Sequence, residues 1–147
     1  MVFAIGWKGD TSHYWLFFWY EWEGVNVINM NIERFREYCM SKIGVSEEFP
    51  FDHKTLVFKV AGKMFALTDV DDFTSINLKC DPEMAVELRE QFDAVAPGYH
   101  MNKKHWNTIT IDGSFSEVLL QQWIDNSYDL VVDKLSKKEK ALLSSFL

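Results

Sequence analysis

The sequence of 147 residues has little of three things that would quickly assign it to a class of protein. Its only cysteines, Cys39 and Cys80, are far apart and form no pair with metal-ligand spacing, which is typical of reduced thiols in the cytoplasm. No apolar run approaches the roughly 20 residues that a membrane-spanning helix needs. Positive charge is also scarce: 15 lysines and arginines against 22 acidic residues give a net charge of −7. That balance disfavours a protein coated in positive charge.

What is present is the composition of an ordinary globular domain. Apolar residues make up 48% of the chain and charged residues 25%, so the chain can bury a core. At this length we expect one domain, over residues 30–147.

Residues 1–29 differ from the rest because they are crowded with aromatic side chains, including the unbroken apolar run Tyr14–Tyr20. The segment is not a signal peptide, because the flank has one lysine, Lys8, and no small-residue cleavage site follows the apolar run. Three interpretations stay open: an additional strand or hairpin, an interfacial arm that binds a partner, or an upstream extension that is not native, with Met30 as the natural start. We favour the third, because Met30 directly precedes a well-formed helix start.

Hydrophobic periodicity predicts a single α+β domain in the order α-β-β-β-α-β-α. The predicted helices cover residues 31–42, 81–92, 114–135 and a short last segment from Ser136, and the predicted strands cover 55–60, 63–68, 75–79 and 106–111. Asn31 and Asp81 are predicted N-caps, and Ser114–Glu117 and Ser136–Glu139 match the capping-box pattern. Short connections between the strands predict an antiparallel twisted sheet of four or more strands with helices on one face.

Alternation along the strands predicts which side chains face away from the helices. The inward set is Leu56, Phe58, Phe65, Leu67, Ile76, Leu78, Ile109 and Ile111. The outward set is Val57, Lys59, Met64, Ala66, Thr68, Asn77, Lys79, Trp106, Thr108 and Thr110. An open face that exposes Trp106 among lysines could bind an anion, a phosphate backbone or a nucleobase, or could simply be solvated.

The segment from Pro97 to Asn107 concentrates polar donors and rings within eleven residues. Together with the sheet lysines it gives the candidate binding residues Lys59, Lys63, Lys79, Tyr99, His100, Asn102, Lys103, Lys104, His105 and Trp106. The two histidines either order the loop or contact a ligand; a third metal ligand at suitable spacing is missing, so we expect no metal and no cofactor. Asn102 is predicted to form a turn in the left-handed conformation.

The chain resembles the MmcQ/YjbR family. The resemblance covers residues 30–138 and includes the run Pro97–Asn107, of which Gly98–Trp106 is the most specific part. Further matches are Phe49–Asp52, Leu56–Val60, Gly62–Leu67, Asn77–Pro82, Leu88–Arg89 and Ser127–Val131. It implies a CyaY/frataxin-like α+β fold and binding of DNA through a double-wing surface of strand hairpins. The aromatic leader has no counterpart in the family pattern.

Two functions therefore stay open. The first is a DNA-binding protein, expected to be monomeric, whose lysines contact phosphates while Trp106 stacks or wedges. The alternative is a domain that binds a small ligand or a protein through the Tyr99–Trp106 loop, with no nucleic-acid role. An enzyme is not expected, because no paired carboxylates, nucleophile elbow, phosphate loop or zinc signature is visible.

Overall fold

The structure, a computed structural model, describes residues 30–147, so the predictions made for residues 1–29 lie outside it. Its helices are α2 (Ile32–Met40), α3 (Pro82–Gln91), α4 (Glu117–Asp133) and α5 (Lys137–Ser144). Its strands are β1 (Val45–Glu48), β2 (Thr55–Val60), β3 (Lys63–Asp69), β4 (Ser75–Lys79), β5 (Val95–Pro97) and β6 (Trp106–Thr110). In this part of the chain, no helix has the length and apolarity that crossing a bilayer requires.

The α+β class and the antiparallel sheet are confirmed. Six strands pair in the order β1-β2-β3-β4-β6-β5, and every pairing is antiparallel. The two edge strands, β1 and β5, were not predicted. β1 reads Val-Ser-Glu-Glu and β5 is three residues ending in Pro97, so neither shows the apolar alternation by which a strand is recognised. Short, charged or proline-bearing strands are typical of sheet edges.

Capping side chains begin each helix. Asn31, Asp81 and Ser136 cap α2, α3 and α5, as predicted, and Ser136 forms a complete capping box with Glu139. The prediction for α4 was wrong: the cap is Ser116, whose side chain accepts from the Leu119 amide. Ser114 instead binds Asp112 in the preceding turn.

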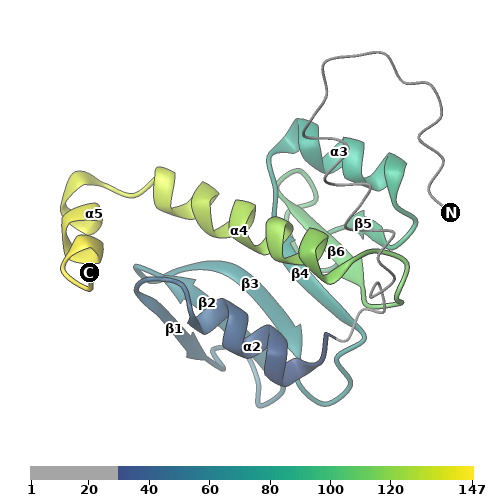
Figure 1. The fold of residues 1–147 in the computed structure, drawn as a ribbon, viewed down its shortest axis with the longest axis horizontal. Coiled ribbons are helices and arrows are strands. Elements are labelled where there is room, and N and C mark those ends of the chain that lie inside the picture. Colours follow the sequence, from purple (N-terminus) through teal and green to yellow (C-terminus); the bar gives the residue numbers. More distant parts are fainter. Residues whose placement is uncertain (1–29) are drawn as a thin grey trace, which may run out of the picture.

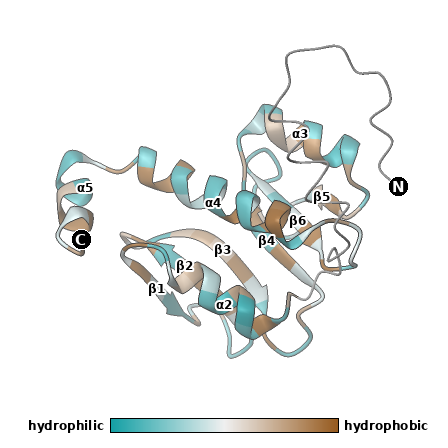
Figure 2. Ribbon diagram, in the orientation of Figure 1, coloured by the Kyte–Doolittle hydropathy of each residue, from teal (hydrophilic) through white to brown (hydrophobic). Residues whose placement is uncertain are grey.

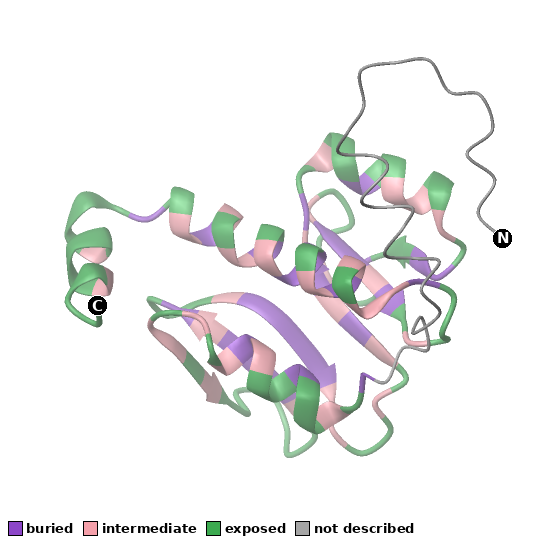
Figure 3. Cartoon of the chain, in the orientation of Figure 1, coloured by how far each residue is buried: buried purple, intermediate pink, exposed green. Residues whose placement is uncertain are grey.

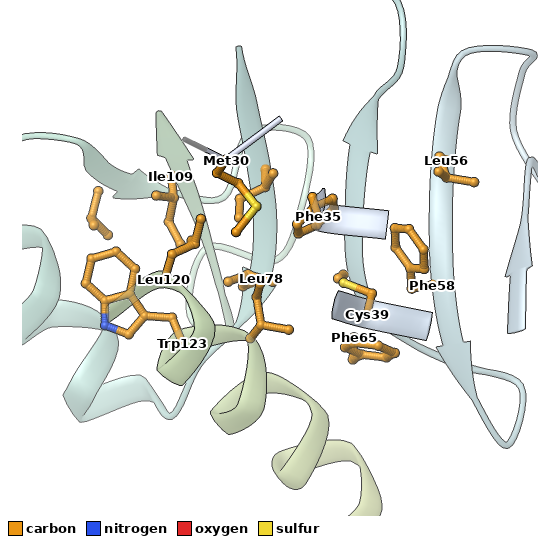
Figure 4. Packing of buried hydrophobic residues seen from close by; sticks show 14 of the residues in the cluster. Met30, Phe35, Cys39, Leu56, Phe58, Phe65, Leu78, Ile109, Leu120 and Trp123 are labelled. Atoms are coloured by element: carbon orange, nitrogen blue, oxygen red, sulfur yellow. The ribbon is translucent and has the colours of Figure 1, made fainter. Parts of the chain in front are cut away.

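The main core lies between the sheet and helices α2 and α4. Figure 1 shows α2 in front of the β1–β3 half of the sheet and α4 running across the middle of the molecule toward α5. Phe35 and Cys39 of α2 pack near Phe58 and Phe65, while Leu120 of α4 fills the neighbouring part of the core (Figure 4). Figure 3 shows purple concentrated on the central strands such as β3, whereas the edge strand β1 is pink and green, and Figure 2 shows teal over much of the helix surfaces.

A β-bulge changes which residues of β3 face the core. The pairing between β2 and β3 shifts between Phe58 and Lys59, so Phe65 and Ala66 both lie against the core. The prediction that Leu67 faces inward and that Ala66 and Thr68 face outward was therefore wrong, because one extra residue reverses the alternation beyond it. Thr68 tolerates burial because its hydroxyl donates to the Ser75 carbonyl at 2.8 Å.

The opposite sheet face is not open at its centre. Val57, Leu67 and Trp106 form a second buried cluster there, with Met64 and Met101 packed at its margin. Trp106 is only 6% exposed. The prediction of an uncovered indole was wrong, because a large ring that lies over neighbouring apolar strand residues gains more from burial than from facing water.

The Ser127 hydroxyl anchors helix α4 to strands β3 and β4 at the point where their pairing ends. Ala66 and Leu78 are the last residues paired between β3 and β4 at this end. Beyond them, the fully buried Ser127 accepts a hydrogen bond from the Lys79 amide at 2.8 Å and donates one to the Phe65 carbonyl. One side chain thus satisfies a donor and an acceptor that the sheet leaves without strand partners.

Replacing Ser127 by alanine is expected to lower the free energy of unfolding by about 2–3 kcal/mol, because both backbone groups would stay buried without a partner. Urea denaturation measures this change. Ser144→Ala on α5 is the matched control: its hydroxyl is exposed and bonds only the Lys140 carbonyl, so a change within about 0.5 kcal/mol is expected. Equal losses in the two variants would contradict the role given to Ser127.

Candidate ligand-binding site

A cavity of about 430 Å³ opens where the end of β4, the start of α3, the loop before β6 and the last turns of α4 meet. We call it the lysine pocket. Its lining residues are Lys79, Cys80, Asp81, Pro82, Asn102, His105, Trp106, Leu130 and Lys134. Its size falls within the range of about 300–1,000 Å³ that small-molecule sites occupy.

The loop wall of the pocket is held by hydrogen bonds within the loop. The Asn102 carbonyl accepts from the amides of His105 and Trp106 at 3.2 and 3.0 Å, and the Asn102 side chain accepts from the Lys104 amide at 2.9 Å. The residue in the left-handed conformation is His100, with φ of 56°, so the prediction that Asn102 adopts it was wrong. The Asn102 side chain caps its own turn, and the left-handed residue lies two positions earlier.

Arg89 of α3 ties the loop to the helix that borders the pocket. Its guanidinium donates to the carbonyls of Lys103 and Trp106 and, at 2.8 Å, to the side-chain oxygen of the buried Asn107. Several donors on one planar group fix the loop in orientation as well as position. Arg89 belongs to the family pattern, but no role was predicted for it from the sequence.

Gly98 lets the two ends of the loop approach closely. Its amide donates to the Trp106 carbonyl at 2.8 Å, and a Cβ at this position would lie 2.8 Å from the Trp106 Cβ. Any larger residue would therefore push the loop away from β6 and change the wall that carries His105 and Trp106.

The electrostatics of the pocket are dominated by lysines. The pKa of Lys79 is lowered, first because the side chain is partly removed from water and then because Lys134 and Lys63 repel its charge. The ammonium lies 5.9 Å from the centre of the Trp106 ring, a distance that allows a cation–π interaction. The carboxylate in the lining, Asp81, caps α3 by accepting from the amides of Glu83 and Met84.

Four of the ten candidate residues meet in the pocket: Lys79, Asn102, His105 and Trp106. The other six lie outside its lining. Lys59 forms an ion pair with Glu48 on the outer sheet face, and Lys63 lies 3.8 Å from Glu139. Lys103 and Lys104 are exposed between the lining residues Asn102 and His105. Tyr99 is 68% exposed and its ring lies against that of His100, with centroids 4.0 Å apart.

Five lining residues were not predicted as site residues. Cys80, Asp81 and Pro82 lie within the family pattern Asn77–Pro82 and directly follow Lys79, but no binding role was assigned to them. Leu130 and Lys134 lie one and two turns after Ser127 on α4, so the anchored face of that helix also reaches the pocket. The sequence carries no signal for Lys134, because the burial of Ser127, from which it lies two turns away, is set by the packing of α4 on the sheet.

The polar groups of the site are ammonium groups, neutral donors and one carboxylate, that of Asp81. Among residues 30–147, no cluster of three or more histidines, cysteines or acidic residues could hold a metal ion. Burial raises the pKa of the Cys80 thiol to about 11, so it is protonated at neutral pH and is a poor nucleophile.

Comparisons with known proteins agree with the resemblance found in the sequence. The model of the YjbR family matches residues 40–130. The chain is 35% identical over 115 residues to the uncharacterized protein YjbR of Escherichia coli K12, covering 78% of this chain and 98% of that protein. It is 32% identical over 109 residues to the uncharacterized protein YyaQ of Bacillus subtilis, covering 64% and 92%.

Two solved structures are similar in fold. The crystal structure of protein DR2400 from Deinococcus radiodurans, with a DUF419 domain, has a TM-score of 0.73 at 42% identity and covers 78% of this chain and 88% of that one. The crystal structure of a Pseudomonas syringae protein has a TM-score of 0.59 at 28% identity and covers 69% and 98%.

The lowered pKa of Lys79 predicts a particular pH dependence of stability. Between its folded value and the ordinary 10.5, the unfolded state binds more protons at this side chain, so the contribution of Lys79 to the free energy of unfolding rises with pH in that window. Lys79→Gln should remove this contribution, and urea denaturation from pH 7 to 11 should then give a less positive slope of the free energy of unfolding against pH than in the wild type. Lys138→Gln on α5 is the control and should keep the wild-type slope; a wild-type slope in Lys79→Gln would refute the assignment.

Proposed function

The chain belongs to the YjbR family, and we propose that it is a non-catalytic protein that binds a small anion in the lysine pocket. The supporting observation is a pair of lysines, Lys79 and Lys134, that line one cavity with no ion-pair partner among residues 30–147. Lys42, Lys54, Lys59 and Lys63 each have an acidic partner in the same part of the chain.

An anion is the natural occupant on energetic grounds. Two ammonium groups that repel each other, one of them partly removed from water, raise the free energy of the folded protein. A negatively charged ligand between them removes that repulsion and accepts their hydrogen bonds. The net charge of −7 does not oppose this, because local lysines set the field inside the pocket.

We further propose that the protein acts in the cytoplasm. Both cysteines of the described residues are free and buried, which suits a reducing compartment.

Loss of both pocket lysines should abolish anion binding. Inorganic phosphate, titrated at constant ionic strength into the full chain, should raise the unfolding temperature of the wild type, since a ligand that binds only the folded state stabilises it by about 2.7 kcal/mol at 100 times its Kd. The double variant Lys79→Gln/Lys134→Gln should show no such rise. The charge-matched control Lys137→Gln/Lys138→Gln, on α5, should respond as the wild type does. An equal response in both double variants would disprove the site.

DNA is a second candidate partner, supported by the exposed Lys103 and Lys104 beside the pocket. Two observations weigh against a continuous DNA-binding face: Trp106 is buried, so it offers no ring for stacking, and Glu48 and Glu139 neutralise Lys59 and Lys63. This candidate therefore places phosphates along the Lys103–Lys104 rim of the pocket instead of across the sheet.

If DNA binds at this rim through about three phosphates, the logarithm of the association constant should fall with the logarithm of salt concentration with a slope of about −2.7. Fluorescence anisotropy with a short duplex measures the slope. Lys103→Gln/Lys104→Gln should reduce its magnitude by about 1–2 relative to the Lys137→Gln/Lys138→Gln control. No binding at low salt, or a slope that the rim variant leaves unchanged, would eliminate this candidate.

A further inference from the structure

The lysine pocket is lined by both ammonium groups and apolar side chains, and from this we infer that its ligand is an organic phosphomonoester. The phosphate would lie between Lys79 and Lys134, and the organic group would lie against Pro82 and Leu130. This inference rests on the proposed anion-binding function and names the class of molecule that the same site takes.

The volume of the pocket argues for an organic group. A water molecule occupies about 30 Å³ in the liquid, and an inorganic phosphate is only a few times larger. Such an ion would leave most of the 430 Å³ cavity to solvent. A ligand with a body attached to its anionic group would displace that solvent and bury the apolar wall.

The apolar wall consists of groups that carry no charge at neutral pH. Pro82 and Leu130 are half-buried, and Trp106 contributes to the lining although 94% of its surface is covered. Cys80 belongs to the same wall because its buried thiol is protonated and behaves as a small apolar group. An apolar group of a ligand would therefore be stabilised by contact with these residues.

Lys79 and Lys134 match a phosphate ester in charge, and neighbouring residues supply hydrogen-bond donors for it. A phosphate monoester carries a charge of about −1.5 to −2 at pH 7, which two ammonium groups balance. Asn102 and His105 stand in the same lining and add N–H donors for a group that accepts several hydrogen bonds. The Asp81 carboxylate, held by the start of α3, disfavours a second negative charge on the organic part.

Both walls are fixed before any ligand arrives. Arg89 and the bonds of Asn102 hold the loop, and Ser127 holds the helix that carries Leu130 and Lys134. A preformed pocket loses little freedom on binding, so differences between ligands should reflect their contacts with the walls.

Isothermal titration of the full-length protein with three probes tests the inference: phenyl phosphate, inorganic phosphate and benzyl alcohol. Phenyl phosphate should bind about tenfold more tightly than inorganic phosphate, because a ring that buries several tens of Å² of apolar surface adds roughly that factor. Benzyl alcohol, which has the ring without the anion, should bind at least about tenfold more weakly than phenyl phosphate. This comparison needs no variant and so does not depend on a mutant that folds.

Leu130→Asn provides a second measurement on the apolar wall. It should weaken phenyl phosphate about fivefold while leaving inorganic phosphate unchanged, since only the ring contacts Leu130. Leu142→Asn, the same change at an exposed position of α5, is the control and should alter neither affinity.

The outcomes separate the two proposals. Equal affinity for phenyl phosphate and inorganic phosphate would overturn the organic ester and leave the anion site standing. Binding of neither anion would overturn both. Benzyl alcohol binding as tightly as phenyl phosphate would also overturn both, because the pocket would then be an apolar site indifferent to charge.

Discussion

The hydroxyl of Ser127 is the contact on which the rest of the arrangement depends. It joins the Lys79 amide to the Phe65 carbonyl at the point where β3 and β4 stop pairing, and it comes from a helix instead of a strand. Because the hydroxyl is fully buried, neither backbone group can turn to water instead. The distance of α4 from the sheet and its rotation about its own axis are therefore fixed. The two turns that follow Ser127 place Leu130 and Lys134 in the same pocket lining as Lys79.

Local chemistry made most of the fold predictable. The four longer strands, the four helices and three of the four caps could be found because periodicity and capping residues act over a few neighbouring positions. Features that depend on contacts between distant parts of the chain could not be predicted from the sequence. The bulge at Phe65–Ala66 reverses the alternation that predicted Leu67 inside, and β1 and β5 exist because they pair with β2 and β6.

Four of the nine lining residues of the candidate site could be predicted, because local sequence patterns pointed to them. The dense segment before β6 pointed to Asn102, His105 and Trp106, and strand alternation pointed to Lys79. Lys134 is 55 positions from Lys79 in the sequence, and only the crossing of α4 over the sheet brings them together. The burial of Trp106 could not be predicted from the sequence either, because it depends on the Leu67 side chain facing outward beside Val57.

The position of Trp106 gives the pocket an optical property. Its indole borders the cavity and lies 5.9 Å from the Lys79 ammonium, so the electronic transition of the ring is subject to the electric field of that charge. Whatever occupies the cavity changes this field by neutralising the charge or by displacing water from the ring edge. Trp106, one of six tryptophans in the sequence, thus contributes fluorescence that responds to occupancy of the pocket without any added dye.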